Sequence, residues 1–228
     1  NITSTTLAAR TATTGSFTDG IASVAVAGTA WLIFMIPHSV GTVSIATAYF
    51  TRMSEHAHAK KFDLLKTDLK KSLRSILAIS AISTAVMAVA AFPIARVFAF
   101  EYRPTVALAL VLIAMMVGLI PFSLNFMLQR VFYALEDTKS PFIFTTIQIA
   151  IFVVGAYICA SQVQAMALVF AISLVMSMSF VVQAFLAYQL LHRRIGSLKE
   201  LGIFRYGSQV VSAGVLASVF GYGVLQLI

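Results

Sequence analysis

The chain of 228 residues is 60% hydrophobic and carries only 16 basic and eight acidic side chains, with a mean hydropathy of +0.93. Soluble domains are roughly 45 to 50% apolar, so this composition excludes an ordinary soluble globular domain. A net charge of +8 would favour a nucleic-acid ligand in a soluble protein, but here the charges lie in short clusters between long apolar runs. We therefore expect a polytopic membrane protein that binds no nucleic acid.

Several stretches contain no Asp, Glu, Lys or Arg and are long enough to cross a hydrocarbon core of about 30 Å, which takes about 20 helical residues. One of them, residues 140–192, is too long for one span and is divided at residues 161–164 (SQVQ). The sequence therefore predicts an all-α fold with about six transmembrane helices, at about 21–51, 75–95, 104–129, 141–160, 165–191 and 206–228.

The ends of the sequence suggest a piece of a larger protein. Residues 1–20 are rich in Thr and only partly apolar, and we expect a loop or the end of a preceding helix there. Residues 21–228 are expected to form one transmembrane lobe. The chain starts at Asn1 without a recognisable signal peptide and finishes within an apolar run at Ile228, so that further spans of the same protein are expected.

Basic residues gather on alternate connections between the expected spans. One side holds only Arg96 and Arg103, with Arg10 if the N-terminal stretch lies there. Because Lys and Arg are enriched in cytoplasmic loops, the connections 52–74, 130–140 and 192–205 are predicted to be cytoplasmic. These carry Arg52, Lys60, Lys61, Lys66, Lys70, Lys71, Arg74, Arg130, Lys139, Arg193, Arg194, Lys199 and Arg205.

The segment 55–74 is predicted to be an amphipathic helix on the membrane surface. Phe62, Leu65, Leu69 and Leu73 recur at helical spacing, with lysines on the other face. The basic face suggests contact with anionic lipid or with a lipid headgroup, and the alternative is an ordinary positive-inside loop. Both interpretations stay open at this stage.

Three residues inside apolar runs are candidates for kinks or hinges. Pro37 and Pro121 each remove a helical hydrogen bond and bend their helix, and Gly118 lies one turn before the second of them. Such kinks suit a protein that moves, although static membrane proteins contain kinked helices as well.

A catalytic role is poorly supported by this sequence. No acidic residue lies within an expected span, and there is no glycine-rich phosphate loop, HExxH zinc motif or nucleophile elbow. His56 and His58 are two residues apart, which places them on different helical faces among lysines, so a metal site is not expected. We therefore predict no enzyme, no cofactor and no metal.

Candidate binding residues are the polar groups within or bordering the spans. An ionisable group inside a membrane usually points inward and is often functional, but Arg130 can also snorkel to the cytoplasmic surface. Two interpretations of Arg130 stay open, a cavity-facing anion ligand and an interfacial anchor. The polar groups are His38, Asn125, Gln129, Arg130, Gln148 and Gln183.

Three motifs resemble the MurJ (MviN) family of bacterial lipid II flippases. Residues 129–142 (QRVFYALEDTKSPF) match the family's loop pattern R-x-F-Y-A-x-x-D-T-[KR]-[ST]-P. Residues 36–40 (IPHSV), 44–48 (SIATA) and 52–54 (RMS) are similar to the kinked first helix of the family's C-terminal lobe. Residues 118–122 (GLIPF) provide the third match, directly upstream of the loop pattern. The motifs occur in the expected order and spacing within about residues 20–142, and the remainder of the chain is compatible in its hydropathy.

The resemblance implies a fold and a substrate. It implies that this chain is one lobe of a MOP-type transporter in a bacterial plasma membrane. The complete transporter has fourteen helices, in two lobes around a V-shaped cavity. The implied substrate is an undecaprenyl-pyrophosphate-linked glycopeptide, whose headgroup is held by cavity arginines, mostly in the N-terminal lobe, and whose lipid tail follows a groove in this one. Many members carry an Arg five residues before the kink proline, and Leu32 stands at that position here. This chain therefore lacks one cation that the family pattern provides.

The leading hypothesis is accordingly a lipid II flippase that works by alternating access from the inner to the outer leaflet. Arg52 and Arg130 are the candidate headgroup or gating residues, and Asn125 and Gln129 are secondary polar groups. An exporter of drugs or of polysaccharide-repeat lipids is the alternative within the same superfamily. A membrane scaffold that recruits cell-wall enzymes through its basic loops is the alternative in a different class.

Overall fold

The computed structural model describes residues 24–99, 101–196 and 202–225, and the first 20 residues of the sequence lie outside this range. Within it, every regular element is helical, as the composition predicts. The elements are α2 (Val24–Pro37), the π-helix η2 (His38–Val43), α3 (Ser44–His58), α4 (Phe62–Val89), α5 (Ala91–Phe98), α6 (Tyr102–Met116), α7 (Leu119–Ala134), α8 (Lys139–Gln162), α9 (Ala165–Ile195) and α10 (Ile203–Leu225).

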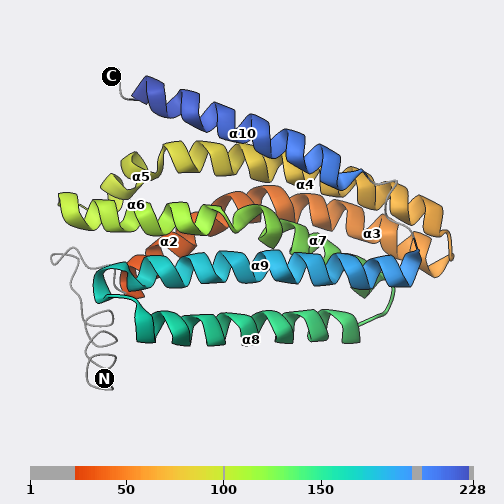
Figure 1. The fold of residues 1–228 in the computed structure, drawn as a ribbon. Helices are drawn as coiled ribbons and strands as arrows, with labels where there is room; N and C mark the ends of the chain where they lie inside the picture. The colour runs from red at the N-terminus through yellow and green to blue at the C-terminus, as the bar shows by residue number, and fades with distance from the viewer. Residues whose placement is uncertain (1–23, 100, 197–201, 226–228) are drawn as a thin grey trace.

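The long helices lie side by side in one bundle. In Figure 1, α10 lies against α4 at one edge of the bundle, and α8 lies against α9 at the opposite edge. The α3–α4 and α7–α8 connections, the end of α9 and the start of α10 are at the same end of the bundle. This end carries the connections with the predicted cytoplasmic excess of Lys and Arg, and we call it the basic end.

The helices overlap the predicted spans, but their bounds differ: the second span helix is Phe62–Val89, and the separate α5 follows it and begins within the predicted span 75–95. Four continuous helices in the described residues are long and apolar enough to cross a membrane: Ala25–His58, Phe62–Val89, Lys139–Gln162 and Ala167–Ile195. The pair α6 and α7 makes a fifth if it counts as one bent span. The sixth predicted span corresponds to α10, which is not among these five but has 23 residues, or roughly 35 Å at 1.5 Å per residue.

The segment 55–74 is not a separate surface helix, in contrast to the expectation. Its first residues belong to the end of α3, and residues from Phe62 onward begin α4, which continues without a break into the span. Leu65, Leu69 and Leu73 are buried against α3, α7 and α9. Helical periodicity identifies an apolar face but cannot tell whether protein or lipid covers it; here protein covers the three leucines, whereas Phe62 is exposed.

Both expected kinks coincide with irregular backbone. Pro37 is the last residue of α2, and the six-residue π-helix η2 follows it directly. Between α6 and α7 the axis bends by 44°. There the Gly118 N–H donates to the Met115 carbonyl at 2.8 Å, so the Ala114 carbonyl loses its usual partner. The Ser177 hydroxyl of α9 donates to that carbonyl at 2.7 Å and satisfies it, as a membrane interior requires.

Candidate functional site

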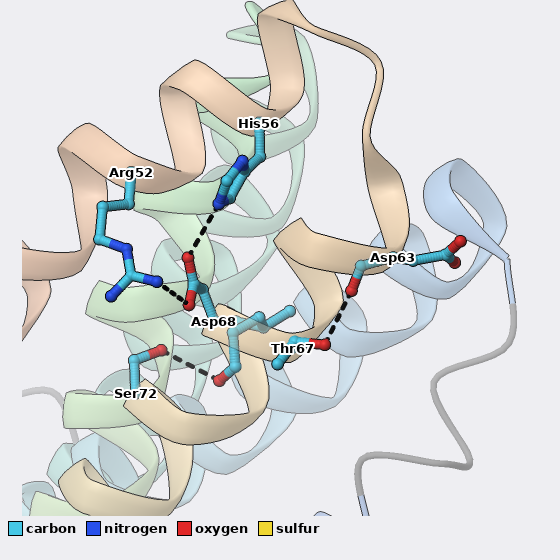
Figure 2. Close-up of polar contacts among 7 residues, drawn as sticks. Arg52, His56, Asp63, Thr67, Asp68 and Ser72 are labelled. Atoms are coloured by element: carbon cyan, nitrogen blue, oxygen red, sulfur yellow. Dashed lines mark hydrogen bonds and ion pairs between the residues drawn. The ribbon is translucent and has the colours of Figure 1, made fainter.

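A buried carboxylate lies against an arginine and a histidine side chain at the basic end. Asp68 of α4 is only 3% exposed, and its Oδ1 accepts a hydrogen bond from Arg52 Nη2 of α3 at 3.0 Å. His56 Nε2, one helical turn further along α3, lies 3.3 Å from Oδ2 (Figure 2). The Arg52 side chain is 58% exposed. The guanidinium of Arg52 is thus at the surface, and the buried carboxylate of Asp68 neutralises its charge.

The turn between α3 and α4 creates this arrangement. Lys60 adopts a left-handed conformation with a φ of 55°, its N–H donates to the Ala57 carbonyl, and the Lys61 N–H donates to the His56 carbonyl. These two bonds form a Schellman motif, which ends a helix and satisfies its last carbonyls. The chain reverses tightly, so α4 returns along α3 and brings Asp68 opposite the last turns of that helix.

Sequence reasoning did not identify Asp68 as a site residue. Its spacing suggests a local i,i+3 pair with Lys71, whereas its partners in the structure are 16 and 12 residues earlier in the chain. The available signal was an acidic residue on the same helical face as Leu65 and Leu69. An acid on an apolar face needs a partner, but the sequence alone does not say which one.

Arg130 lies between two aromatic rings of α7 and α3. Its guanidinium carbon is 4.9 Å from the centre of the Phe126 ring and 5.6 Å from that of Phe50. Both distances are within the range of cation–π attraction. Arg130 and its neighbour Gln129 are half-buried. The structure therefore places Arg130 against α3 through stacking, while Arg52 is held from α4 through an ion pair.

Asn125 is part of a contact between helices. It is 2% exposed, and its side-chain N–H groups donate to the Phe180 carbonyl at 3.1 Å and to Gln183 Oε1 at 3.0 Å. Gln183 in turn donates to the Thr145 hydroxyl of α8. Interhelical side-chain bonds of this kind hold membrane helices together. The structure thus brings Asn125 to α9 and away from a surface where it would contact a ligand.

The loop pattern that carries the family resemblance forms a tight corner between α7 and α8. Glu136 is left-handed with a φ of 57°, its N–H donates to the Tyr133 carbonyl, and the Asp137 N–H donates to the Phe132 carbonyl. Asp137 then accepts the N–H groups of the first two residues of α8, each at 3.0 Å, and the hydroxyl of the second, Ser140, at 2.8 Å. The pattern thus joins a Schellman motif to a helix cap, and most of its residues are structural.

Asp137 contributes a pH-dependent term to stability. Burial raises the pKa of its carboxyl, but the Ser140 and Lys139 hydrogen bonds and the charge of Arg194 outweigh it, so the pKa lies below its ordinary value of 3.8. The stabilisation is fully present above that ordinary value and is lost as the pH falls through the lower, folded-state pKa.

We expect Asp137→Ala to lower the free energy of unfolding by about 0.5–2 kcal/mol at pH 7, the usual cost of a lost cap. Denaturant unfolding of the full-length protein in detergent measures this loss, and at pH 3 the difference from the parent protein should shrink. Lys139→Ala is the control, because Lys139 donates through its backbone N–H. An equal loss in that control would argue against the cap.

Two hollows open near the basic end and along the bundle. The first, about 990 Å³, lies between the α3–α4 turn, the α7–α8 corner and the end of α9. The second, about 510 Å³, is an almost wholly apolar groove between α4, α7, α9 and α10. Pro121, a candidate hinge residue, lines the second groove together with Leu124, Phe185 and Tyr188. Its apolar lining suits a hydrocarbon chain.

Leu32, where the family pattern has a cation, is 70% exposed on α2, and Ile36 and Val40 continue the same exposed apolar face. Among the described residues of this face, no neighbouring cation replaces the absent Arg.

Comparisons with known proteins identify a family and a solved structure of similar fold. The model of the family described as lipid II flippase MurJ matches residues 3–228. Among solved structures, the chain is similar to one described as lipid II flippase MurJ in an inward closed conformation, with a TM-score of 0.65 and 18% sequence identity. The match covers 89% of this chain and 47% of that one, so the chain spans about half the length of that protein. No curated protein sequence matches.

The solved structure shows a shared fold at this level of identity, and the family model covers nearly the whole sequence. The helical spans, the bent α6–α7 pair and the corner between α7 and α8 are the structural counterparts of the motifs that first suggested the relationship. The chain belongs to the lipid II flippase MurJ family.

Proposed function

We propose that this chain is the C-terminal lobe of a lipid II flippase, a transporter and not an enzyme. In this proposal, the complete protein moves an undecaprenyl-pyrophosphate-linked glycopeptide from the inner to the outer leaflet of a bacterial plasma membrane. The observation that carries the proposal is the family match over residues 3–228. The basic end would face the cytoplasm, with the connections 52–74, 130–140 and 192–205 on that side.

Two features of the lobe supply chemistry that such a substrate needs. Arg52 offers an exposed guanidinium at the basic end, where a pyrophosphate group would enter from the cytoplasmic leaflet. Arg130 lies on the neighbouring helix, and Gln129 precedes it. The apolar groove between α4, α7, α9 and α10 would take part of the lipid tail. Asn125 supports these groups through the α7–α9 contact and does not itself bind the headgroup.

Transport in this proposal requires movement against an N-terminal lobe of the same protein. Pro37, Gly118 and Pro121 lie at or next to two of the breaks in regular helix and are the candidate hinges. The membrane potential would favour export, because carrying two negative charges outward across an inside-negative membrane releases about 4–5 kcal/mol per 100 mV. No nucleotide would then be needed.

Arg130→Ala tests the proposed headgroup contact. In a strain depleted of its own flippase, the full-length variant is expected to insert normally but to fail in supporting growth. Loss of one charge-assisted contact, worth about 1.5–3 kcal/mol, should weaken headgroup binding about 10- to 100-fold. Arg193→Ala, an exposed Arg at the same end, is the matched control and should support growth. Normal growth with Arg130→Ala would remove this residue from the site.

A further inference from the structure

The Arg52, Asp68 and His56 cluster has an asymmetry that a simple structural ion pair does not need. Asp68 is buried, but the guanidinium that neutralises it is more than half exposed. The pair uses one Arg52 nitrogen, Nη2, whereas a guanidinium has five N–H donors. The pair therefore leaves further N–H donors on the exposed side chain of Arg52 that an anion could use.

Moving an Arg away from a buried acid is normally costly, because the carboxylate is then left in the protein interior as an uncompensated charge. Here a second donor is already in place. His56 Nε2 lies 3.3 Å from Asp68 Oδ2, yet the geometry at that distance does not make a hydrogen bond, and Oδ2 has no other donor among the described residues. A small movement of the imidazole would complete the bond.

The two donors differ in their freedom to move. The His56 side chain is 22% exposed and that of Arg52 is 58% exposed, and both stand on the same face of α3, one turn apart (Figure 2). An imidazole with hydrogen on Nε2 donates to a carboxylate whether or not it is charged. His56 can therefore hold the acid while Arg52 binds elsewhere.

We propose that Asp68 is an internal competitor for the phosphate ligand of Arg52. Asp68 holds the guanidinium while no anion is bound and yields it to a phosphate or pyrophosphate group, and His56 then keeps the carboxylate paired. Asp68 is thus a positioning residue that acts through Arg52 and limits how tightly the anion is held. A transporter benefits from this exchange, because the headgroup must leave as well as bind. The inference rests on the proposed function in one respect, the contact between Arg52 and the headgroup.

The test measures anion binding to the full-length protein in lipid nanodiscs, with undecaprenyl pyrophosphate in one arm and inorganic pyrophosphate in the other. Asp68→Asn keeps the shape of the side chain and removes the competing charge, and should tighten binding about 2- to 5-fold, as expected for a partly exposed pair. Asp63→Asn makes the same change of charge at an exposed position of α4 and should leave affinity unchanged. A response in the lipid arm identifies a lipid headgroup as the ligand, and a response with inorganic pyrophosphate alone identifies a soluble one.

His56→Ala provides the opposite prediction and keeps the test decisive if Asp68→Asn folds poorly. Without the second donor, release of Arg52 leaves the buried acid unpaired, so anion binding should weaken, whereas His58→Ala, an exposed position two residues away, should not change it. Weaker or unchanged binding in a folded Asp68→Asn protein overturns the competitor role. Unchanged binding in His56→Ala overturns the role of His56.

Arg52→Ala separates this inference from the proposed function. If Arg52 contacts the headgroup, its removal weakens binding, and adding Asp68→Asn to Arg52→Ala has no further effect. If Arg52→Ala leaves binding unchanged, the proposed headgroup contact itself fails. If Arg52→Ala weakens binding but Asp68→Asn in the otherwise unchanged protein does not tighten it, only the exchange is wrong.

Discussion

Leu69→Asp is expected to lower the free energy of unfolding by about 3–5 kcal/mol, the usual cost of an uncompensated buried charge. Leu69 is 0% exposed and packs with Leu65, Val131 and Phe132 in the core of the basic end. The core is closed on this side by α3, α7 and α9, so water cannot reach a new carboxylate without opening the bundle. Unfolding of the full-length protein by a denaturing detergent, followed by circular dichroism, measures the loss.

Leu64→Asp is the matched control for this prediction. Leu64 is in the first turn of α4 and is 47% exposed, and an acid near a helix N-terminus interacts favourably with the helix dipole. The change in the free energy of unfolding should stay within about 0.5 kcal/mol. Equal losses at the two positions would contradict the buried assignment and would favour the surface-helix interpretation of residues 55–74.

Gly118→Val is the second substitution with a large expected effect. A Cβ at this position would lie 2.8 Å from Ser177 Oγ and 3.0 Å from Ser177 Cα. The second of these atoms is backbone, so α9 as a whole would have to move away. Overpacking of this kind typically costs about 1–3 kcal/mol. The displacement would also break the Ser177 bond to the Ala114 carbonyl and leave that carbonyl unsatisfied at the α6–α7 bend.

Two further glycine variants test whether the contact with Ser177 causes the loss of stability. Gly118→Ala should show a smaller loss of stability than Gly118→Val, because a single methyl group already meets Ser177. Gly28→Ala should be neutral or stabilising by up to about 1 kcal/mol, since an added Cβ there has no atom within 4 Å and Ala is the better helix former. The same detergent unfolding measures all three. A neutral Gly118→Val would mean that α7 and α9 do not approach closely at the bend.

The charge pattern and hydropathy predict much of the architecture correctly. Runs without charged residues define the spans, because only an apolar helix satisfies its backbone in hydrocarbon. Pro37 and Gly118 mark two of the breaks in regular helix, because proline removes a donor and glycine admits close approach of a neighbouring helix. Three short motifs identify the family. These features depend on residues that are close together in the chain, so the amino-acid sequence is sufficient to predict them.

Only the tertiary structure shows which polar side chains pair with each other and which apolar faces are covered by protein. The apolar face with Leu65 and Leu69 looks the same in sequence whether lipid or protein covers it, and the return of α4 along α3 is what buries it. Asp68 finds Arg52 and His56 only because the turn at Lys60 sets the register of the two helices. Asn125 is a polar residue in a span, and the position of α9 makes it an interhelical contact. Side chains distant in sequence meet according to helix packing, which hydropathy does not encode.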